Sequence, residues 1–168
     1  SWELCLVDGS TNNERTDALK EYAKQDTRIV YRRVNENLGI SGNSNVGFKM
    51  AKGLFIGLLD HDDTLSPHAL EEVVIAYNNN PKADIIYSDE DKLSDDGSER
   101  LLPFFKPDWS PDLLLGVNYI THFLVVKQQL VTAVGGLRSE FDGAQDYDFL
   151  LRITEKTDNI VHIPKMLY

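Results

Sequence analysis

Short apolar runs alternate along the chain with segments of helical spacing, and this alternation limits the fold more than any other feature of the sequence. The runs are rich in β-branched residues and are bounded by polar, glycine or proline residues, as strands are. The six runs are Glu3–Asp8, Arg28–Val34, Leu54–Asp60, Ala83–Ser88, His122–Lys127 and Asn159–Pro164. The alternation predicts an α/β layer fold with a mixed, mostly parallel sheet and flanking helices. Because ligands of such sheets bind beyond the carboxyl ends of the strands, the polar residues there are the first candidates for a site.

The 168 residues contain neither an internal repeat nor a long linker, which predicts one domain. Ser1 leads straight into a strand and Tyr168 directly follows an apolar segment, so we expect a partial domain over residues 1–168 with sequence missing on each side. The stretch Asp89–Trp109 has no clear periodicity and is expected to be a functional or mobile loop, with a hairpin or turn at Asp95–Ser98.

The charge balance argues against unassisted nucleic-acid binding. The chain has 17 Lys and Arg residues and 27 Asp and Glu residues, a net charge of −10, whereas phosphate contact needs clustered cations. The single Cys5 excludes an intramolecular disulfide or a cysteine metal cluster and fits a reducing compartment. No window approaches the roughly 20 apolar residues of a membrane span. We therefore expect a cytoplasmic segment without a membrane span.

The densest local signal is the string Asp60-His61-Asp62-Asp63, which ends an apolar run. Carboxylates this close repel one another unless a cation offsets their charge. Carboxylate oxygens suit Mg²⁺ or Mn²⁺, and such ions commonly share their coordination shell with substrate phosphates. The alternative is a solvated acidic turn before a helix. The position at the end of a strand favours a divalent cation site.

Three other segments contain candidate functional residues, and for some of them a purely structural role is the alternative. Asp146 lies near the start of an expected helix, where an acid can simply cap the helix or can act as a general base toward an acceptor hydroxyl. The segment Asn37–Asn45 is a polar, glycine-containing turn that leads into a helix, and its N–H groups could hold phosphate or ribose. A plain loop with a helix cap is the alternative there. Asp89 and Asp91 are further acids that could line a site.

Several familiar site types do not occur in the sequence. Phe48 stands where a P-loop needs lysine, and there is no G-x-G-x-x-G string. The acidic stretch from Asp89 fails the calcium-loop register, because Ser94 takes the sixth position, where glycine is required. The four histidines, His122 among them, lack zinc-type spacing and are expected to be ordinary surface or packing groups. No serine lies in a G-x-S-x-G elbow.

Taken together, strings along almost the whole chain resemble the family 2 glycosyltransferases, a large inverting group with a GT-A fold. Val7-Asp8-Gly9-Ser10-Thr11 is similar to the family's "VDDGST" turn, Asn37–Asn45 with Ala51-Lys52-Gly53 to its "NxG…N…G…AxG" segment, and Leu59-Asp60-His61-Asp62-Asp63 to its "LDxDD" metal motif. Tyr87–Lys92, Phe105–Asp112, Val134-Gly135-Gly136 and Gln145–Asp148 resemble the subgroup that builds bacterial cell-surface polysaccharides such as O-antigen. The resemblance also implies that the family's first strand and its C-terminal segment are missing here.

The resemblance implies metal-dependent, inverting transfer of a sugar from a UDP- or dTDP-linked donor to a glycan or lipid-linked glycan acceptor. The cation would be Mn²⁺ or Mg²⁺, and the full protein is expected to associate peripherally with the inner face of the cell membrane. Carried over by position, the resemblance implies that Asp60 and Asp62 bind the metal and the pyrophosphate, with Asp62 as the direct ligand. Asp8 would contact the nucleotide base, and Gly42 and Asn45 would lie beside the nucleotide. Asp146 would be the general base of the reaction.

Two other interpretations stay open. A nucleotidyltransferase also uses carboxylates at strand ends with Mg²⁺, but it would be expected to show a glycine-rich loop with Lys or Arg for a triphosphate. A non-catalytic module or fragment that binds nucleotide or glycan belongs to a different class of protein. Metal-dependent nucleotide binding, compared between the wild type and Asp62→Ala, would discriminate among these interpretations.

Overall fold

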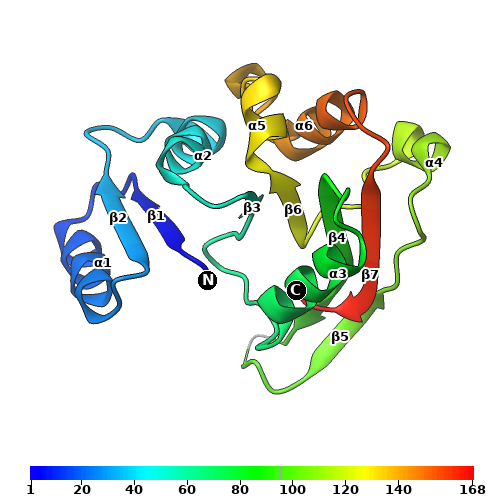
Figure 1. Ribbon diagram of the computed structural model, residues 1–168. Helices are drawn as coiled ribbons and strands as arrows, with labels where there is room; N and C mark the ends of the chain where they lie inside the picture. Colours follow the sequence, from blue (N-terminus) through cyan, green and yellow to red (C-terminus); the bar gives the residue numbers. More distant parts are fainter. Residues whose placement is uncertain (95) are drawn as a thin grey trace.

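The computed structural model describes residues 1–94 and 96–168, so Asp95 of the expected turn lies outside the described residues. Strands and helices alternate through the first half of the chain (Figure 1). In chain order the elements are β1 (Leu4–Asp8), α1 (Asn13–Gln25), β2 (Ile29–Arg33), α2 (Gly39–Met50), β3 (Phe55–Gly57), α3 (Ala69–Asn79), β4 (Ile85–Leu93), β5 (Arg100–Phe104), α4 (Pro111–Gly116), β6 (Leu124–Lys127), α5 (Gln128–Ala133), η1 (Ser139–Phe141), α6 (Gln145–Thr154) and β7 (Ile160–Met166). Across the described ranges, no helix has both the length and the apolar character needed to cross a membrane.

The strands form two sheets whose directions differ from the expected arrangement. β1 and β2 pair in parallel, whereas the second sheet has the order β3-β6-β4-β5, with β7 paired to β4. In this second sheet β4 and β7 are parallel, while β3 and β6, β6 and β4, and β4 and β5 are antiparallel. The α/β class, the mixed sheet and the flanking helices are confirmed, but antiparallel pairs outnumber parallel ones, so the expected predominance of parallel strands is wrong. Strands covered on both faces are continuous apolar runs in either direction, so the sequence pattern does not distinguish the two.

The segment Asp89–Trp109, expected to be a loop with a hairpin or turn at Asp95–Ser98, contains the end of β4 and all of β5, which pair antiparallel. β4 continues to Leu93, and β5 pairs antiparallel with it. In the described part of the turn, the N–H of Gly97 donates to the carbonyl of Ser94 at 2.8 Å, and Gly97 has a φ of +69°. Every residue of β5 is exposed, and Pro103 lies within it. A strand with no buried face has no alternation to detect, and proline is typical of edge strands, which explains why the sequence did not reveal β5.

The segment expected as a turn before a helix is itself helical. α2 begins at Gly39, so Gly42 and Asn45 lie inside this helix and not in a turn. Glycine and asparagine have low helix propensity, but tertiary contacts override it here. Ser41 is buried, and both its N–H and its hydroxyl donate to the carboxylate of Asp142.

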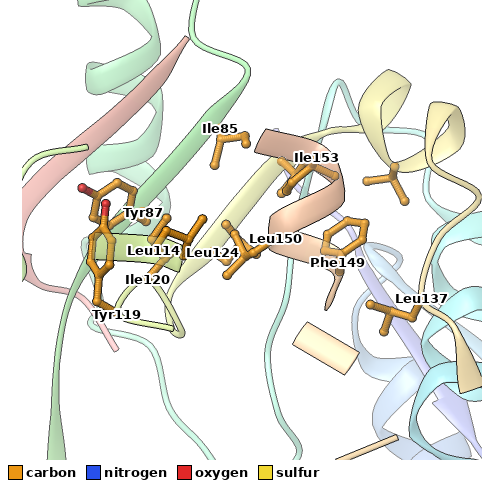
Figure 2. Close-up of a cluster of buried hydrophobic side chains, with 12 residues drawn as sticks. Ile85, Tyr87, Leu114, Tyr119, Ile120, Leu124, Leu137, Phe149, Leu150 and Ile153 are labelled. Atoms are coloured by element: carbon orange, nitrogen blue, oxygen red, sulfur yellow. The ribbon is translucent and has the colours of Figure 1, made fainter. Parts of the chain in front are cut away.

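Buried hydrophobic side chains gather on both faces of the second sheet. Successive residues of β4 and β6 point to opposite faces: Ile85 and Leu124 join one cluster with α4, α5 and α6, whereas Ile86 and Val125 join another with α3 and β7. Figure 2 shows side chains of β4, β6, α4 and α6 meeting in the first cluster. Throughout the described chain, the buried hydrophobic residues all lie at or after Ala69. The buried residues before that position are polar, namely Asp8, Thr16 and Ser41.

Candidate active site

The loop after β3 brings three metal-ligating side chains together. Asp60 and Asp63 lie in this loop, and His122 lies just before β6. One ligand atom from each residue lies within 4.8 Å of the others, and Nε2 of His122 is 4.0 Å from Oδ2 of Asp60. Because β6 runs antiparallel to β3, the start of β6 lies beside the end of β3, where the N–H of Leu58 donates to the carbonyl of Leu124 at 3.1 Å. Carboxylates suit Mg²⁺ and Mn²⁺, and an imidazole favours the transition metal, so this group fits a divalent cation.

Tyr168 orders this group. Its hydroxyl donates to Oδ2 of Asp63 at 2.6 Å and accepts the N–H of Asp60 at 3.2 Å. Its ring stacks on that of His122, with centroids 4.7 Å apart and 13° between the planes. Burial, reinforced by the hydrogen bond to Asp63, raises the pKa of Tyr168 well above its ordinary value, so the hydroxyl remains a donor. A single side chain therefore contacts all three members of the group.

Asp62, which the resemblance assigns as the direct metal ligand, lies outside this group. Its side chain is 75% exposed, and Oδ1 lies 3.5 Å from Nδ1 of His61. Asp62 does line two neighbouring hollows. The smaller, of about 450 Å³, is also lined by Asp60 and Gln145, and the larger, of about 760 Å³, by Asp63 and His122. The ligand role of Asp62 stays a prediction.

Asp146 lies in the first turn of α6, directly after Gln145 of the smaller hollow. Its half-buried carboxylate accepts Nδ2 of Asn118 at 3.1 Å and the N–H of Tyr147 at 2.8 Å. In the described part of the chain, Oδ1 of Asn118 is the one buried side-chain polar atom without a hydrogen-bond partner. The structure thus places the N-terminus of α6 beside the smaller hollow, which Asp60 and Asp62 also line. The catalytic role of Asp146 stays a prediction.

Asp8 is buried at the end of β1 and accepts four hydrogen bonds. Oδ1 accepts the N–H and hydroxyl of Ser10 at 2.9 and 2.5 Å, and Oδ2 accepts Thr16 Oγ1 at 2.8 Å and the Tyr31 hydroxyl at 2.7 Å. Burial by itself raises the pKa of a carboxyl group, but these bonds outweigh it and hold the pKa of Asp8 well below its usual range. The carboxylate therefore organises the turn, and its acceptor sites are all in use.

Gly42 and Asn45, expected beside the nucleotide, have contacts within the protein. Oδ1 of Asn45 accepts the N–H of Leu137 at 2.9 Å, and Nδ2 donates to the carbonyl of Leu137 at 2.8 Å. Both polar atoms of this side chain are thus bonded to the backbone before α6. The residues of α2 that line the smaller hollow are Asn43 and Ser44, with Ile40.

The acids after β4 have different surroundings. Asp89 is buried, and its Oδ1 accepts the N–H of Lys106 at 2.9 Å and lies 2.8 Å from Nε2 of His162. Asp91 forms an ion pair with Arg100 and lines the larger hollow. Asp89 is therefore a structural group, and the Asp91 side chain, only 8% exposed, is held by Arg100 at the wall of the larger hollow.

Sequence reasoning missed His122, Asp63 and Tyr168 as members of the site. Asp63 belonged to the recognised acidic string, but nothing in the string ranks it above Asp62. His122 begins an apolar run, and a parallel sheet places strand starts at the opposite edge from strand ends, so the expected topology put His122 far from the aspartates. The sequence does not show that β6 runs antiparallel to β3, and this direction is what brings His122 to the aspartates.

Known proteins are similar to this chain over most of its length. The sequence model of glycosyl transferase family 2 matches residues 1–137. The O-antigen biosynthesis protein RfbC of Myxococcus xanthus is 46% identical over 168 residues, which are 99% of this chain and 13% of RfbC. The chain thus spans a small part of that relative.

Solved structures share the architecture. S. aureus TarS 1–349 in complex with UDP matches with a TM-score of 0.78 at 19% identity, over 99% of this chain and 50% of TarS. The mannosyltransferase PcManGT from Pyrobaculum calidifontis, in complex with GDP-Man and Mn²⁺, matches with a TM-score of 0.70 at 14% identity, over 98% and 46% of the two chains. At these identities the likeness shows the GT-A fold alone. Since that fold agrees with a family model covering four-fifths of the residues, the chain belongs to glycosyl transferase family 2.

Proposed function

We propose that this domain transfers a sugar, with inversion, from a nucleotide-diphosphate donor to a glycan acceptor in the synthesis of a bacterial cell-surface polysaccharide. Family membership supports sugar transfer, and the name of the 46% identical relative supports a polysaccharide product. TarS binds UDP and PcManGT binds GDP-Man with Mn²⁺, which supports a nucleotide-linked donor, here UDP- or dTDP-linked, and a cation. A lipid-linked glycan acceptor would bring the domain to the cytoplasmic face of the membrane.

The main support for this proposal is the closeness of the Asp60, Asp63 and His122 side chains. These side chains would hold Mn²⁺ or Mg²⁺, because their ligand atoms lie within 4.8 Å of one another. Asp62 lies in the same loop, between Asp60 and Asp63, and its exposed side chain could turn toward a bound ion. When bound, the ion would offset the negative charge that grows on the leaving diphosphate.

The smaller hollow is the proposed place of the donor nucleotide. It joins Asn43 and Ser44 of α2 to Asp60 and Asp62. The β1 turn lies against the same region, because a Cβ on Gly9 would come within 3.0 Å of Nδ2 of Asn43. Asp8 would therefore act on the base through the turn that it organises, since its own oxygens already accept four hydrogen bonds.

Asp146 is the proposed general base. A carboxylate can take the proton of an acceptor hydroxyl as the oxygen attacks the anomeric carbon, and a single displacement inverts that carbon. The hydrogen bonds from Asn118 and the Tyr147 N–H hold the carboxylate in place, and Gln145 connects this helix end with the donor hollow.

Calorimetric titration of UDP with and without Mn²⁺ tests the proposal. We expect Mn²⁺ to strengthen UDP binding in the wild type, and Asp60→Ala and His122→Ala to lose this strengthening. Asp62→Ala would lose it too if the exposed carboxylate joins the ion. Asp17→Ala, on the exposed face of α1, is the control and should bind as the wild type does.

The outcome that contradicts the metal role is equal UDP binding by all variants with and without Mn²⁺. Turnover distinguishes the enzyme classes. A glycosyltransferase releases nucleoside diphosphate from a nucleotide sugar, whereas a nucleotidyltransferase releases pyrophosphate from a triphosphate. Release of pyrophosphate alone would replace the proposed reaction with that of a nucleotidyltransferase.

A further inference from the structure

Lys106 is a fully buried lysine, with a side chain that is 0% exposed. An ammonium group has three N–H donors, and all three find acceptors here. Nζ donates to Oε2 of Glu90 at 2.8 Å, to the carbonyl of Ile120 at 2.7 Å and to the carbonyl of His122. Two of the three acceptors are therefore backbone atoms of one short segment, residues 120–122.

Glu90 binds the same segment through the oxygen that accepts the bond from Lys106. Its Oε2 accepts the hydroxyl of Thr121 at 2.7 Å and the N–H of His122 at 3.2 Å. Burial opposes the charge on Glu90, but the hydrogen bonds from Lys106 and Thr121 outweigh it and lower the pKa of this carboxyl group. The Lys106–Glu90 pair thus contacts the backbone of His122 on both its N–H and its carbonyl.

The held segment has a backbone conformation that needs support. Thr121 has a φ of +33°, in the left-handed region that non-glycine residues rarely occupy. Such conformations persist when surrounding contacts over-determine them, and they cluster at functional sites. The contacts that hold Thr121 in this conformation come from Lys106 and Glu90, and the next residue in the chain is His122.

The position of the imidazole follows from this backbone. The ring of His122 lies between Tyr168, on which it stacks, and Asp60, from which Nε2 is 4.0 Å away. A change at residues 120–122 would move the ring relative to Asp60 and Asp63. A contribution to stability is a weak reason for a buried ion pair, because apolar side chains of similar volume are often as stabilising. A positional role explains better why the hydrogen bonds converge on this backbone.

We propose that the buried Lys106–Glu90 pair is a positioning element that holds His122 as the nitrogen ligand of the divalent cation. The proposal rests on the cation site of the proposed function and names the residues that set its geometry. Groups that orient a metal-bound histidine typically change metal affinity by 10- to 100-fold when removed.

The test uses Mn²⁺ alone as the probe, with two readouts besides activity. Calorimetry gives the affinity, and pulsed electron paramagnetic resonance detects the nitrogen of an imidazole bound to Mn²⁺. We expect the wild type to show a nitrogen signal that His122→Ala abolishes. Lys106→Met should weaken Mn²⁺ binding by about 10-fold or more and reduce the nitrogen signal.

Lys127→Met is the matched control. Lys127 also forms a partly buried ion pair in the same sheet, with Asp84 at 2.7 Å, but it makes no hydrogen bond to residues 120–122 in the described chain. This variant should keep both the Mn²⁺ affinity and the nitrogen signal. If Lys106→Met does not fold, Thr121→Val removes only the hydroxyl bond to Glu90 and should give a smaller loss in the same two readouts.

The outcomes separate the inference from the proposed function. A folded Lys106→Met, or Thr121→Val in its place, with the affinity and nitrogen signal of the wild type would overturn the positioning role while leaving the cation site intact. Mn²⁺ bound by the wild type without any nitrogen signal would do the same. A wild type that binds no Mn²⁺ would overturn the cation site itself and the inference with it.

Discussion

At the scale of single residues, the carboxylates of this domain divide into those whose oxygens are occupied and those that are free for a ligand. Asp8 accepts four hydrogen bonds and Asp89 is buried against Lys106 and His162. Asp62 is 75% exposed and lines both hollows. All three follow or end an apolar run, so the sequence could propose them as a class. It could not sort them, because the partners of Asp8 and Asp89 come from other elements.

The first prediction concerns Asp8→Asn. Because hydrogen bonds depress the pKa of Asp8 in the folded state, its stabilising contribution is complete above the unfolded-state pKa of about 3.9 and is lost as pH falls toward the folded-state value. The variant should lose about 1–3 kcal/mol of unfolding free energy at pH 7. The difference from the wild type should shrink below about pH 3.9. Urea unfolding at a series of pH values measures this, and a difference that stays constant down to pH 3 would contradict it.

At the scale of elements, the direction of β6 decided what the sequence could predict about the site. The string Asp60–Asp63 lies at a strand end, where sequence reasoning placed it. His122 joins it because β6 is antiparallel to β3, and apolar runs carry no information on direction. The same limit applies to α2, where contacts of Ser41 and Asn45 with distant residues convert an expected turn into helix.

A pair of substitutions in α2 separates packing from ligand binding. Asn45→Ala removes both hydrogen bonds to Leu137 and should cost about 1–3 kcal/mol of unfolding free energy. Asn43 lines the donor hollow, and its bonds to Asn37 and Leu38 are exposed. Asn43→Ala should therefore cost less than about 1 kcal/mol, as exposed substitutions usually do, while weakening UDP binding. Chemical unfolding and calorimetry on both variants measure this, and the reverse pattern would restore the role first expected for Asn45.

At the scale of the whole molecule, burial is unevenly distributed. The buried hydrophobic residues of the described chain all lie at or after Ala69, around the second sheet. The β1–β2 sheet is joined to the rest through α2 and through Glu3, whose Oε1 accepts the N–H groups of Lys52 at 2.6 Å and Gly53 at 3.1 Å.

Hydrogen exchange should reveal this asymmetry. Amides of β1 and β2 are expected to exchange through openings of lower free energy than amides of β4, β6 and β7, because less apolar surface is buried around them. Native-state exchange followed by mass spectrometry measures the protection of each strand. Equal protection of the two sheets would contradict the expectation.

The contacts of Tyr168 have a consequence for biosynthesis. Its hydroxyl bonds to Asp60, which lies 108 positions earlier in the chain, and to Asp63. A ribosome adds residues from the N-terminus at about 5–20 per second, so the aspartate loop emerges several seconds before the tyrosine that orders it. A nascent chain that has not yet released Tyr168 therefore lacks the hydroxyl that orders the proposed cation site.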